Sequence, residues 1–364
     1  HLSIRRQRQM CIRDRSTPHL TRAVRFRMML EQLGPTFIKL GQVLSTRPDL
    51  LPADIVSELA NLQDSVTPVE WTRFRAGLDS SSLAILETLV DFNPKPIASA
   101  SIAQVYEARL KSHERVAVKI VRPGARRIIR DDLQILEHLG RLIQTHVEEA
   151  RDWNIPGLIE QFRTSITHEL DLQHEGRNAD IFRNNFANDD TIAVPKVYWD
   201  YTNRDMLVME FIDGRRIAEY FAPDTDPALR KQLAQTGAKA VLKQIFEHGF
   251  FQADPHPGNA FVLDGGVICF LDFGMFGRME PHSLNLLAGA LHAIVHKDVD
   301  RLLRTARDMD ILNHTPTEPS LRLAVLDMLE QYHGIPLKQI HVPFLLRDII
   351  TLMNRYRLTV RPDI

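Results

Sequence analysis

The 364-residue sequence contains only two cysteines, Cys11 and Cys269, too few and too far apart for a disulfide framework. This cysteine usage is typical of a reducing compartment. No stretch approaches the roughly 18–20 uninterrupted apolar residues of a membrane-spanning helix, and there is no signal-peptide pattern. The formal net charge of −1 gives no overall field that would favour nucleic acid. The remaining composition, 44% apolar and 25% charged, is that of an ordinary globular protein.

The two ends of the sequence differ from its middle. The first thirty residues carry eight arginines against one acidic residue, Asp14. Both a basic face near an anionic membrane and an ordinary solvated helix fit this pattern. Residues 1–15 show no apolar periodicity and do not begin with Met, so we expect them to be a non-native or disordered leader. The last residues carry no helix stop, so we expect the C-terminal region to be truncated.

A polar constellation lies in residues 252–274. Residues 252–259 read Gln-Ala-Asp-Pro-His-Pro-Gly-Asn, and after a short hairpin comes Leu-Asp-Phe-Gly at 271–274. Asp254, Asn259 and Asp272 therefore have the spacing of kinase-like phosphotransferases. Asp254 can accept a hydroxyl proton, and the Asp272 carboxylate can hold a metal on the phosphates of a nucleotide. Asp-Phe-Gly alone occurs by chance in many chains, but the combination across one hairpin is much more specific.

A second pattern concerns phosphate binding. Residues 98–105 read Ala-Ser-Ala-Ser-Ile-Ala-Gln-Val, which is the Gly-rich loop of protein kinases with alanine in place of glycine. Alanine makes positive φ angles costly, by roughly 1 kcal/mol per residue, so we expect this loop to cradle phosphates differently. Downstream, Val-Ala-Val-Lys ends at Lys119 in an apolar strand, where an ammonium group needs an anion. A lysine that reaches out to water is the alternative interpretation.

The helical pattern at 155–186 offers a carboxylate partner for Lys119. Glu169, Asp171 and Glu175 are the candidates. On one continuous helix Asp171 and Glu175 share a face, whereas Glu169 and Asp171 point to different environments. At least one carboxylate can then pair with Lys119 while another points elsewhere, although an ordinary charged helix face remains the alternative.

Three regions follow one another along the chain. Residues 16–97 are predicted to be a helical extension. Residues 98–212 combine strand-like runs at 105–109, 116–121, 192–200 and 206–212 with long helical patterns at about 125–149 and 155–186, which indicates a small lobe. From residue 213 to 364 helices dominate, which indicates a large lobe. The predicted fold is α+β and protein-kinase-like, with two lobes and an N-terminal helical extension. Helical periodicity resumes soon after Gly274 without an Ala-Pro-Glu anchor, so peptide phosphorylation is not expected.

Further motifs lie outside the generic kinase parts. Phe37-Ile38-Lys39-Leu40-Gly41-Gln42 contains Lys-x-Gly-Gln, and Ser-Thr-Arg-Pro-Asp-Leu-Leu-Pro follows at 45–52. Together with the Ala-rich loop and Glu169-x-Asp171, they give residues 16–364 a pattern that resembles the UbiB (AarF) family of atypical kinase-like proteins. That family is linked to ubiquinone biosynthesis and isoprenoid lipid homeostasis.

The resemblance implies a role for each matching residue. Lys39 and Gln42 would cover the site where a peptide would dock, with Lys39 paired to the Glu169/Asp171 pair. Lys119 would contact phosphates, with Glu175 as its ion-pair partner, Asn259 and Asp272 would coordinate Mg²⁺, and Asp254 would be the catalytic-loop carboxylate. The loop residues expected at the nucleotide are Ala98, Ser99, Ala100, Ser101, Ala103 and Val105. Backbone groups from Glu210 to Ile212 would hold the adenine.

We therefore expect an ATP- or ADP-binding, Mg²⁺-dependent ATPase or phosphotransferase that supports ubiquinone biosynthesis. Its expected partners are an isoprenoid or quinone-precursor lipid, quinone-biosynthesis proteins and, peripherally, the cytoplasmic face of a bacterial inner membrane. The hydrophobic C-terminal segments usual in bacterial members are absent, and Gln252-Ala253 replaces the His-Arg of protein kinases. Two alternatives stay open: a small-molecule or lipid kinase, and a non-catalytic, nucleotide-dependent regulator of a lipid biosynthetic complex.

Overall fold

The computed structural model describes residues 20–45, 51–62, 66–146, 154–253, 255–309, 311–312 and 319–332, with positions 348, 351–352, 355–356 and 358. The leader expected at residues 1–15 lies outside the described residues, as does Asp254. The chain divides into two compact units. The first comprises His1–Gly77, Pro96–Gln104 and Arg122–Ile166, and the second Leu78–Lys95, Val105–Val121 and Thr167–Ile364.

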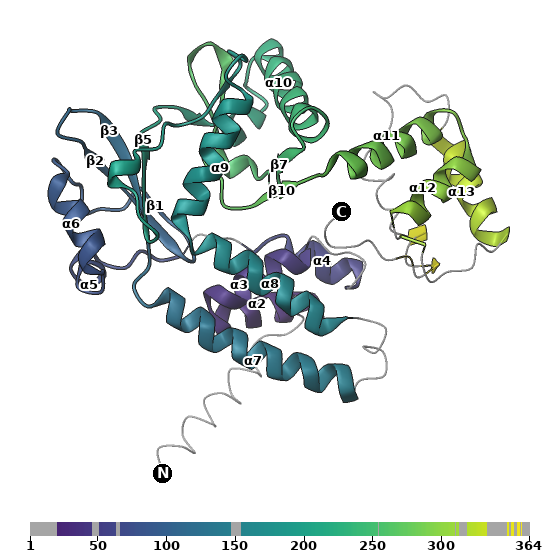
Figure 1. Ribbon diagram of the computed structural model, residues 1–364, viewed down its shortest axis with the longest axis horizontal. Helices are drawn as coiled ribbons and strands as arrows, with labels where there is room; N and C mark the ends of the chain where they lie inside the picture. Colours follow the sequence, from purple (N-terminus) through teal and green to yellow (C-terminus); the bar gives the residue numbers. More distant parts are fainter. Residues whose placement is uncertain are drawn as a thin grey trace. The chain divides into compact units, whose positions relative to one another are not determined.

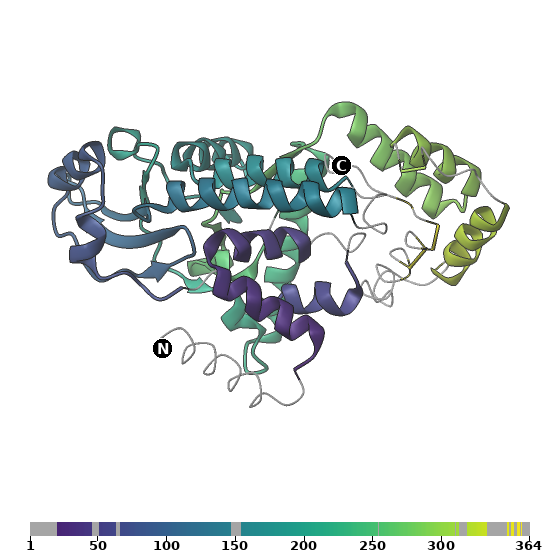
Figure 2. The ribbon, with the colours of Figure 1, turned by 90° about the horizontal axis from the view of Figure 1, so that it is seen from below.

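The first unit is built mainly from helices. They are α2 (Arg22–Leu33), α3 (Pro35–Ser45), α4 (Ala53–Leu59), α5 (Trp71–Arg75), α7 (Ala125–His146) and most of α8 (Ile155–Glu169). Gly34 ends α2 with a φ of 107°, and Pro35 opens α3, so the chain turns sharply between them. Buried Leu30, Leu59 and Leu62 form the core that these first helices share. Helices α7 and α8 lie side by side (Figures 1 and 2).

A four-stranded sheet carries the predicted lysine. Its strands are β1 (Ala98–Ser99), β2 (Ala103–Arg109), β3 (Arg115–Val121) and β5 (Met206–Glu210), in the order β1-β2-β3-β5. Strand β2 begins in the first unit and continues into the second. In β3 the side chains of Val116, Val118 and Ile120 are fully buried, so alternation turns Lys119 to the opposite face. Strand β5 pairs antiparallel with β3 and places Leu207 opposite Lys119.

The rest of the second unit combines two small sheets with helices. One sheet has the order β4-β9-β8-β6, from β4 (Ile192–Ala193), β9 (Ile268–Phe270), β8 (Ala260–Val262) and β6 (Arg215–Arg216). The other pairs β7 (Phe250–Gln252) with β10 (Phe276–Arg278). The helices are α6 (Ser80–Thr88), α9 (Leu172–Asn185), α10 (Pro227–Phe246), α11 (Pro281–Val295), α12 (Val299–Asp308) and α13 (Pro319–Tyr332). Figure 1 shows α9 beside β5.

The local structure agrees with some of the sequence-based predictions and differs from others. The hairpin at Asp264-Gly265-Gly266 is confirmed: both glycines have a φ of 79° and join β8 to β9. The quick return to helix after Gly274 is also confirmed, because only the short β10 precedes α11. The strand predicted at 192–200 is confirmed only in part. It is interrupted at Pro195, which lacks an N–H, Val197 then forms an isolated antiparallel bridge with Met209, and the chain turns into a 3₁₀ helix, η2, at Trp199–Tyr201. Among the described residues, no helix combines the length and apolar character needed to cross a bilayer.

Candidate active site

A buried ion pair lies at the centre of the candidate site. Lys119 Nζ on β3 lies 2.7 and 2.8 Å from the two carboxylate oxygens of Glu175, in the first turn of α9. The Glu175 side chain is only 2% exposed and that of Lys119 is 22% exposed. Glu175 as the partner of Lys119 is therefore confirmed. A carboxylate in the first turn of a helix is also favoured by the helix dipole.

The other two candidate carboxylates are arranged differently from the prediction. The helix expected over 155–186 is interrupted, so α8 ends at Glu169 and α9 begins at Leu172. Asp171 is the N-cap of α9, and its carboxylate accepts the backbone N–H groups of Gln173 (3.1 Å) and His174 (3.3 Å). The predicted shared helix face of Asp171 and Glu175 is therefore wrong, because a capping residue is not part of the helix.

The charges around Lys119 determine its protonation. Burial alone would lower the pKa of Lys119, but the negative charges of Glu175, Asp272 and Glu169 outweigh burial and raise that pKa above its ordinary value. Burial raises the pKa of Glu175, and Lys119 opposes this rise. Lys119 is consequently a permanent ammonium group that faces more than one carboxylate, which suits contact with phosphate oxygens.

The predicted metal ligands lie together. Asn259, in the 3₁₀ helix η4 (Pro257–Asn259), donates from Nδ2 to Asp272 Oδ2 at 3.0 Å, and the Gly274 N–H donates to Asp272 Oδ1 at 3.0 Å. One carboxylate and one amide oxygen are the hard donors that Mg²⁺ takes from a protein when phosphates supply the remaining ligands. Among the described residues no cluster of three or more His, Cys, Asp or Glu side chains could hold a metal by itself. The donor set therefore fits a metal that is shared with a nucleotide.

The backbone around Asp272 is held by amide side chains whose contacts the sequence did not predict. Gln252 Nε2 donates to the Asp272 carbonyl oxygen at 2.9 Å, and Gln244 Oε1 accepts the Gln252 N–H at 2.9 Å. Asn178 Nδ2, on α9, donates to the Phe273 carbonyl oxygen at 2.9 Å. The one available signal was Gln252 itself, which stands where protein kinases have a histidine.

An aromatic cluster fixes the phenylalanine of Asp-Phe-Gly. Phe273 is fully buried, with its ring centroid 5.8 Å from Phe182 and 5.9 Å from Phe276. Phe182 belongs to α9, the helix that carries Glu175. The same helix therefore packs on the residue after Asp272 and pairs with Lys119.

The Ala-rich loop belongs to the first unit. The Ala100 N–H donates to the Ala103 carbonyl at 2.9 Å, and the Arg122 guanidinium donates to Ala100 O at 2.9 Å and to Ser99 Oγ at 2.7 Å. None of the described alanines in the loop has a positive φ. The conformation therefore avoids the strain that glycine would relieve, and a buried Ser101 completes the turn.

The Lys-x-Gly-Gln motif lies on α3 in the first unit. A Cβ atom at Gly41 would lie 2.3 Å from Leu62 Cδ1 and 2.8 Å from Leu30 Cδ1, so glycine is needed there for close packing. Gln42 Nε2 donates to the Leu62 carbonyl at 3.4 Å. Lys39 and its expected partners at Glu169 and Asp171 belong to different units, and their pairing stays a prediction.

The segment expected to hold adenine has part of its hydrogen-bonding capacity in use. The Glu210 N–H donates to Lys196 O at 2.8 Å, and the Phe211 N–H donates to Arg115 O at 3.1 Å. The expected contact with a base would therefore depend on Ile212 and on carbonyl oxygens.

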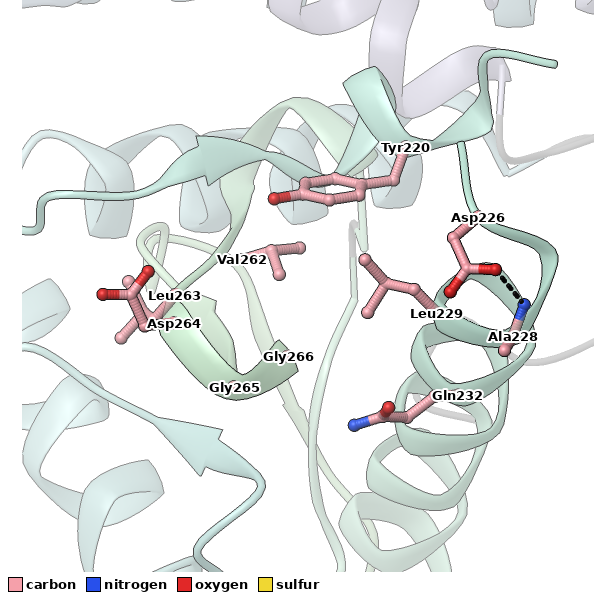
Figure 3. A pocket seen from close by; sticks show the side chains of 10 residues that line it. All are labelled: Tyr220, Asp226, Ala228, Leu229, Gln232, Val262, Leu263, Asp264, Gly265 and Gly266. Carbon is pink, nitrogen blue, oxygen red and sulfur yellow. Dashed lines mark hydrogen bonds between the residues drawn. The ribbon is translucent and has the colours of Figure 1, made fainter. Parts of the chain in front are cut away.

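A separate pocket of about 520 Å³ lies beside the β8–β9 hairpin and the start of α10. Figure 3 shows the Tyr220 ring over Leu229 and Val262, with Gln232 below. Asp226 at its rim accepts the Ala228 N–H at 3.2 Å as the N-cap of α10. None of the residues expected at the nucleotide lines this pocket, so it is distinct from the candidate site.

Comparison with known proteins identifies a family and several relatives of this chain. The family model described as "ABC1 atypical kinase-like domain" matches residues 61–306. The uncharacterized protein sll1770 of Synechocystis is 39% identical over 85% of this chain and 53% of that protein. "Probable protein kinase UbiB" of Cellvibrio japonicus is 36% identical over 95% of this chain and 64% of that protein. An Arabidopsis thaliana relative, "Protein ACTIVITY OF BC1 COMPLEX KINASE 3, chloroplastic", is 36% identical over 83% of this chain and 43% of that protein.

A solved structure supports the predicted fold. The complex of Rv3197 with erythromycin, from Mycobacterium tuberculosis, matches with a TM-score of 0.59 at 22% identity and covers 87% of each chain. The predicted α+β, kinase-like fold is thereby confirmed. The chain spans less than two thirds of the length of these curated relatives. It belongs to the ABC1/UbiB family of atypical kinase-like proteins.

Proposed function

We propose that this chain binds a Mg²⁺-nucleotide at Lys119, Asn259 and Asp272 and acts as an ATPase or small-molecule phosphotransferase that supports isoprenoid quinone biosynthesis. The observation that carries the proposal is the buried Lys119–Glu175 pair next to the Asp272 carboxylate. The Cellvibrio relative is named "Probable protein kinase UbiB", which is consistent with the proposal. The expected substrate is an isoprenoid or quinone-precursor lipid, met at the cytoplasmic face of a bacterial inner membrane with other quinone-biosynthesis proteins.

Each residue has a role that follows from its chemistry. Lys119 contacts phosphate oxygens as a permanent cation, and Glu175 keeps the ammonium in place. Asp272 and Asn259 hold the metal, whose charge offsets that of the phosphates. Asp254, which lies outside the described residues, is assigned to receive the proton of a hydroxyl or water nucleophile.

The acceptor is not expected to be a peptide. Residues 275–280 form little more than β10 before α11 begins, so the segment on which protein kinases dock peptides is missing. Replacement of His-Arg by Gln252-Ala253 favours a second candidate function, in which slow turnover serves as a nucleotide-dependent switch for a lipid biosynthetic complex.

The test compares nucleotide turnover and binding in the parent, Lys119→Met and Asp272→Asn, with and without quinone-precursor mimics in lipid vesicles. Asp264→Asn, an exposed carboxylate on the β8–β9 turn, is the matched control. We expect turnover to fall by about 10²-fold or more in the two site variants and to be unchanged in the control. Turnover that survives Asp272→Asn would remove the proposed metal site, and binding without any turnover would favour the switch.

A further inference from the structure

One buried amide connects the ion pair to the metal ligand. The Asn178 residue is 4% exposed, and its Nδ2 donates to the Phe273 carbonyl oxygen at 2.9 Å. The same Nδ2 lies 3.4 Å from His174 Nδ1, a longer contact. A buried amide that donates to a main-chain carbonyl restrains the backbone, because losing the donor would leave that carbonyl unsatisfied.

Asn178 lies on α9, the helix that also carries Glu175. Asn178 follows Glu175 by three residues, so the two side chains project from the same face of the helix. Glu175 holds Lys119, and Asn178 holds the backbone immediately after Asp272. Any displacement of α9 would therefore act on the phosphate-binding lysine and on the metal-binding carboxylate at once.

A second amide holds the preceding carbonyl. Gln252 on β7 donates to Asp272 O, so two consecutive carbonyls, those of Asp272 and Phe273, are each anchored by a side-chain amide. The Gln252 anchor comes from β7, whereas the Asn178 anchor comes from α9. Of these two amides, Asn178 is the one on the helix that carries Glu175, so it links the Asp272 backbone to the ion pair by a hydrogen bond, beside the packing of Phe182 on Phe273.

We propose that Asn178 is a positioning residue, which orients the Asp272 carboxylate and couples it through α9 to the Lys119–Glu175 pair. This inference rests on the proposed function in so far as Asp272 holds the metal. A purely structural role for Asn178 would lower stability alone. A positioning role must also change the order of the Asp272 segment and the amount of metal it needs.

The variants are Asn178→Leu, which keeps the branched side chain without a donor although it is larger, and Asn178→Ala, which removes the donor without adding bulk. Thr202→Val is the matched control, because the buried Thr202 hydroxyl also makes two hydrogen bonds in the second unit, to Tyr198 O and Val208 N. Its loss should destabilise the unit comparably without touching Asp272.

The first measurement is amide hydrogen exchange of residues 270–276 in the protein without nucleotide. The Gly274 N–H reports directly on the carboxylate, because Asp272 Oδ1 accepts it. We expect exchange of this segment to accelerate about tenfold in both Asn178 variants and to stay unchanged in Thr202→Val. Equal exchange in the parent and the Asn178 variants would overturn the positioning role.

The second measurement is the Mg²⁺ concentration that half-saturates ATP binding. Loss of the Asn178 side chain, which supports the backbone next to the proposed metal ligand Asp272, should raise this Mg²⁺ concentration by about tenfold. The affinity for ATP in excess EDTA should stay within about twofold of that of the parent. A requirement equal to that of the parent would overturn the coupling to the metal site. If the parent itself binds no nucleotide in the presence of Mg²⁺, the proposed function fails, and the exchange result alone still decides whether Asn178 positions the Asp272 segment.

Discussion

Replacing Lys119 by methionine should destabilise the second unit through the carboxylate left behind. Glu175 is 2% exposed and receives both of its short contacts from Lys119 Nζ, at 2.7 and 2.8 Å. Without the lysine, the free energy of unfolding must fall because a buried carboxylate loses its counter-charge. Breaking a buried pair from one side in this way costs about 3–5 kcal/mol.

The opposite substitution, Glu175→Gln, should lower the free energy of unfolding by less than Lys119→Met does. In this variant Lys119 still has the negative charge of Asp272 nearby. Its side chain is 22% exposed and flexible, so the ammonium group can also turn toward water. We expect a loss of about 1–3 kcal/mol there. The double variant Lys119→Met/Glu175→Leu removes both charges and should lie within about 2 kcal/mol of the parent, although it can bind no phosphate through this pair.

The pH dependence of the stability of Lys119→Met tests whether the buried Glu175 carboxylate causes the loss. Burial raises the pKa of Glu175 above its ordinary value of 4.5, and in Lys119→Met no cation opposes this rise. A folded-state carboxyl with a raised pKa binds a proton that the unfolded chain releases, so lowering the pH from neutrality toward 4.5 should shrink the deficit. Urea unfolding of the parent, both single variants and the double variant at several pH values measures this. Equal losses in the two single variants, or a deficit independent of pH, would refute the reasoning.

Two further predictions concern packing and acid stability. Gly41→Ala should lower the free energy of unfolding by about 1–2 kcal/mol in a urea titration, because overpacking against Leu62 and Leu30 exceeds the gain in helix propensity. The control is Gly237→Ala on α10, where an added Cβ would meet only Ile268 Cδ1, at 3.8 Å. This variant should be as stable as the parent or more stable. Lys243 lies 2.5 Å from Asp189 and, with Thr191, lowers the pKa of Asp189 to about 2. A carboxyl whose folded-state pKa is lowered contributes stability above its ordinary pKa of 3.8, and this contribution is lost as the pH falls toward 2. Lys243→Met should therefore be less stable than the parent at neutral pH, and urea titrations should show the difference narrowing toward pH 2. A difference that stays constant down to that pH would contradict the assignment.

Much of the candidate site could be predicted where its chemistry is local. The apolar Val-Ala-Val run required an anion for Lys119. The helical pattern at 155–186 offered three carboxylates, and the family resemblance pointed to Glu175 among them, as the structure confirms. The turn at Asp264-Gly265-Gly266 followed from residues that favour positive φ. These predictions held because burial and backbone conformation can be read from a few neighbouring residues.

The break between α8 and α9 could not be predicted in the same way. Asp171 fits a charged helix face as readily as a cap, and its capping role depends on the backbone turning at Leu170. The hydrogen bonds of Asn178 and Gln252 could not be predicted for a related reason. Their partners are main-chain carbonyls distant in sequence, and a carbonyl has no residue-type signature.

The side chains that support Asp272 are uncharged amides, and the charges around them explain why. Lys119 faces the negative charges of Glu175, Asp272 and Glu169. A further carboxylate in support of Asp272 would compete for the metal or raise the pKa of its neighbours, and a further cation would take the place of the metal. Amides such as Asn178, Gln252 and Asn259 supply directional hydrogen bonds without adding charge. Asn178→Asp should therefore be more harmful than Asn178→Leu, because it replaces a buried donor with a buried negative charge that faces the Phe273 carbonyl oxygen.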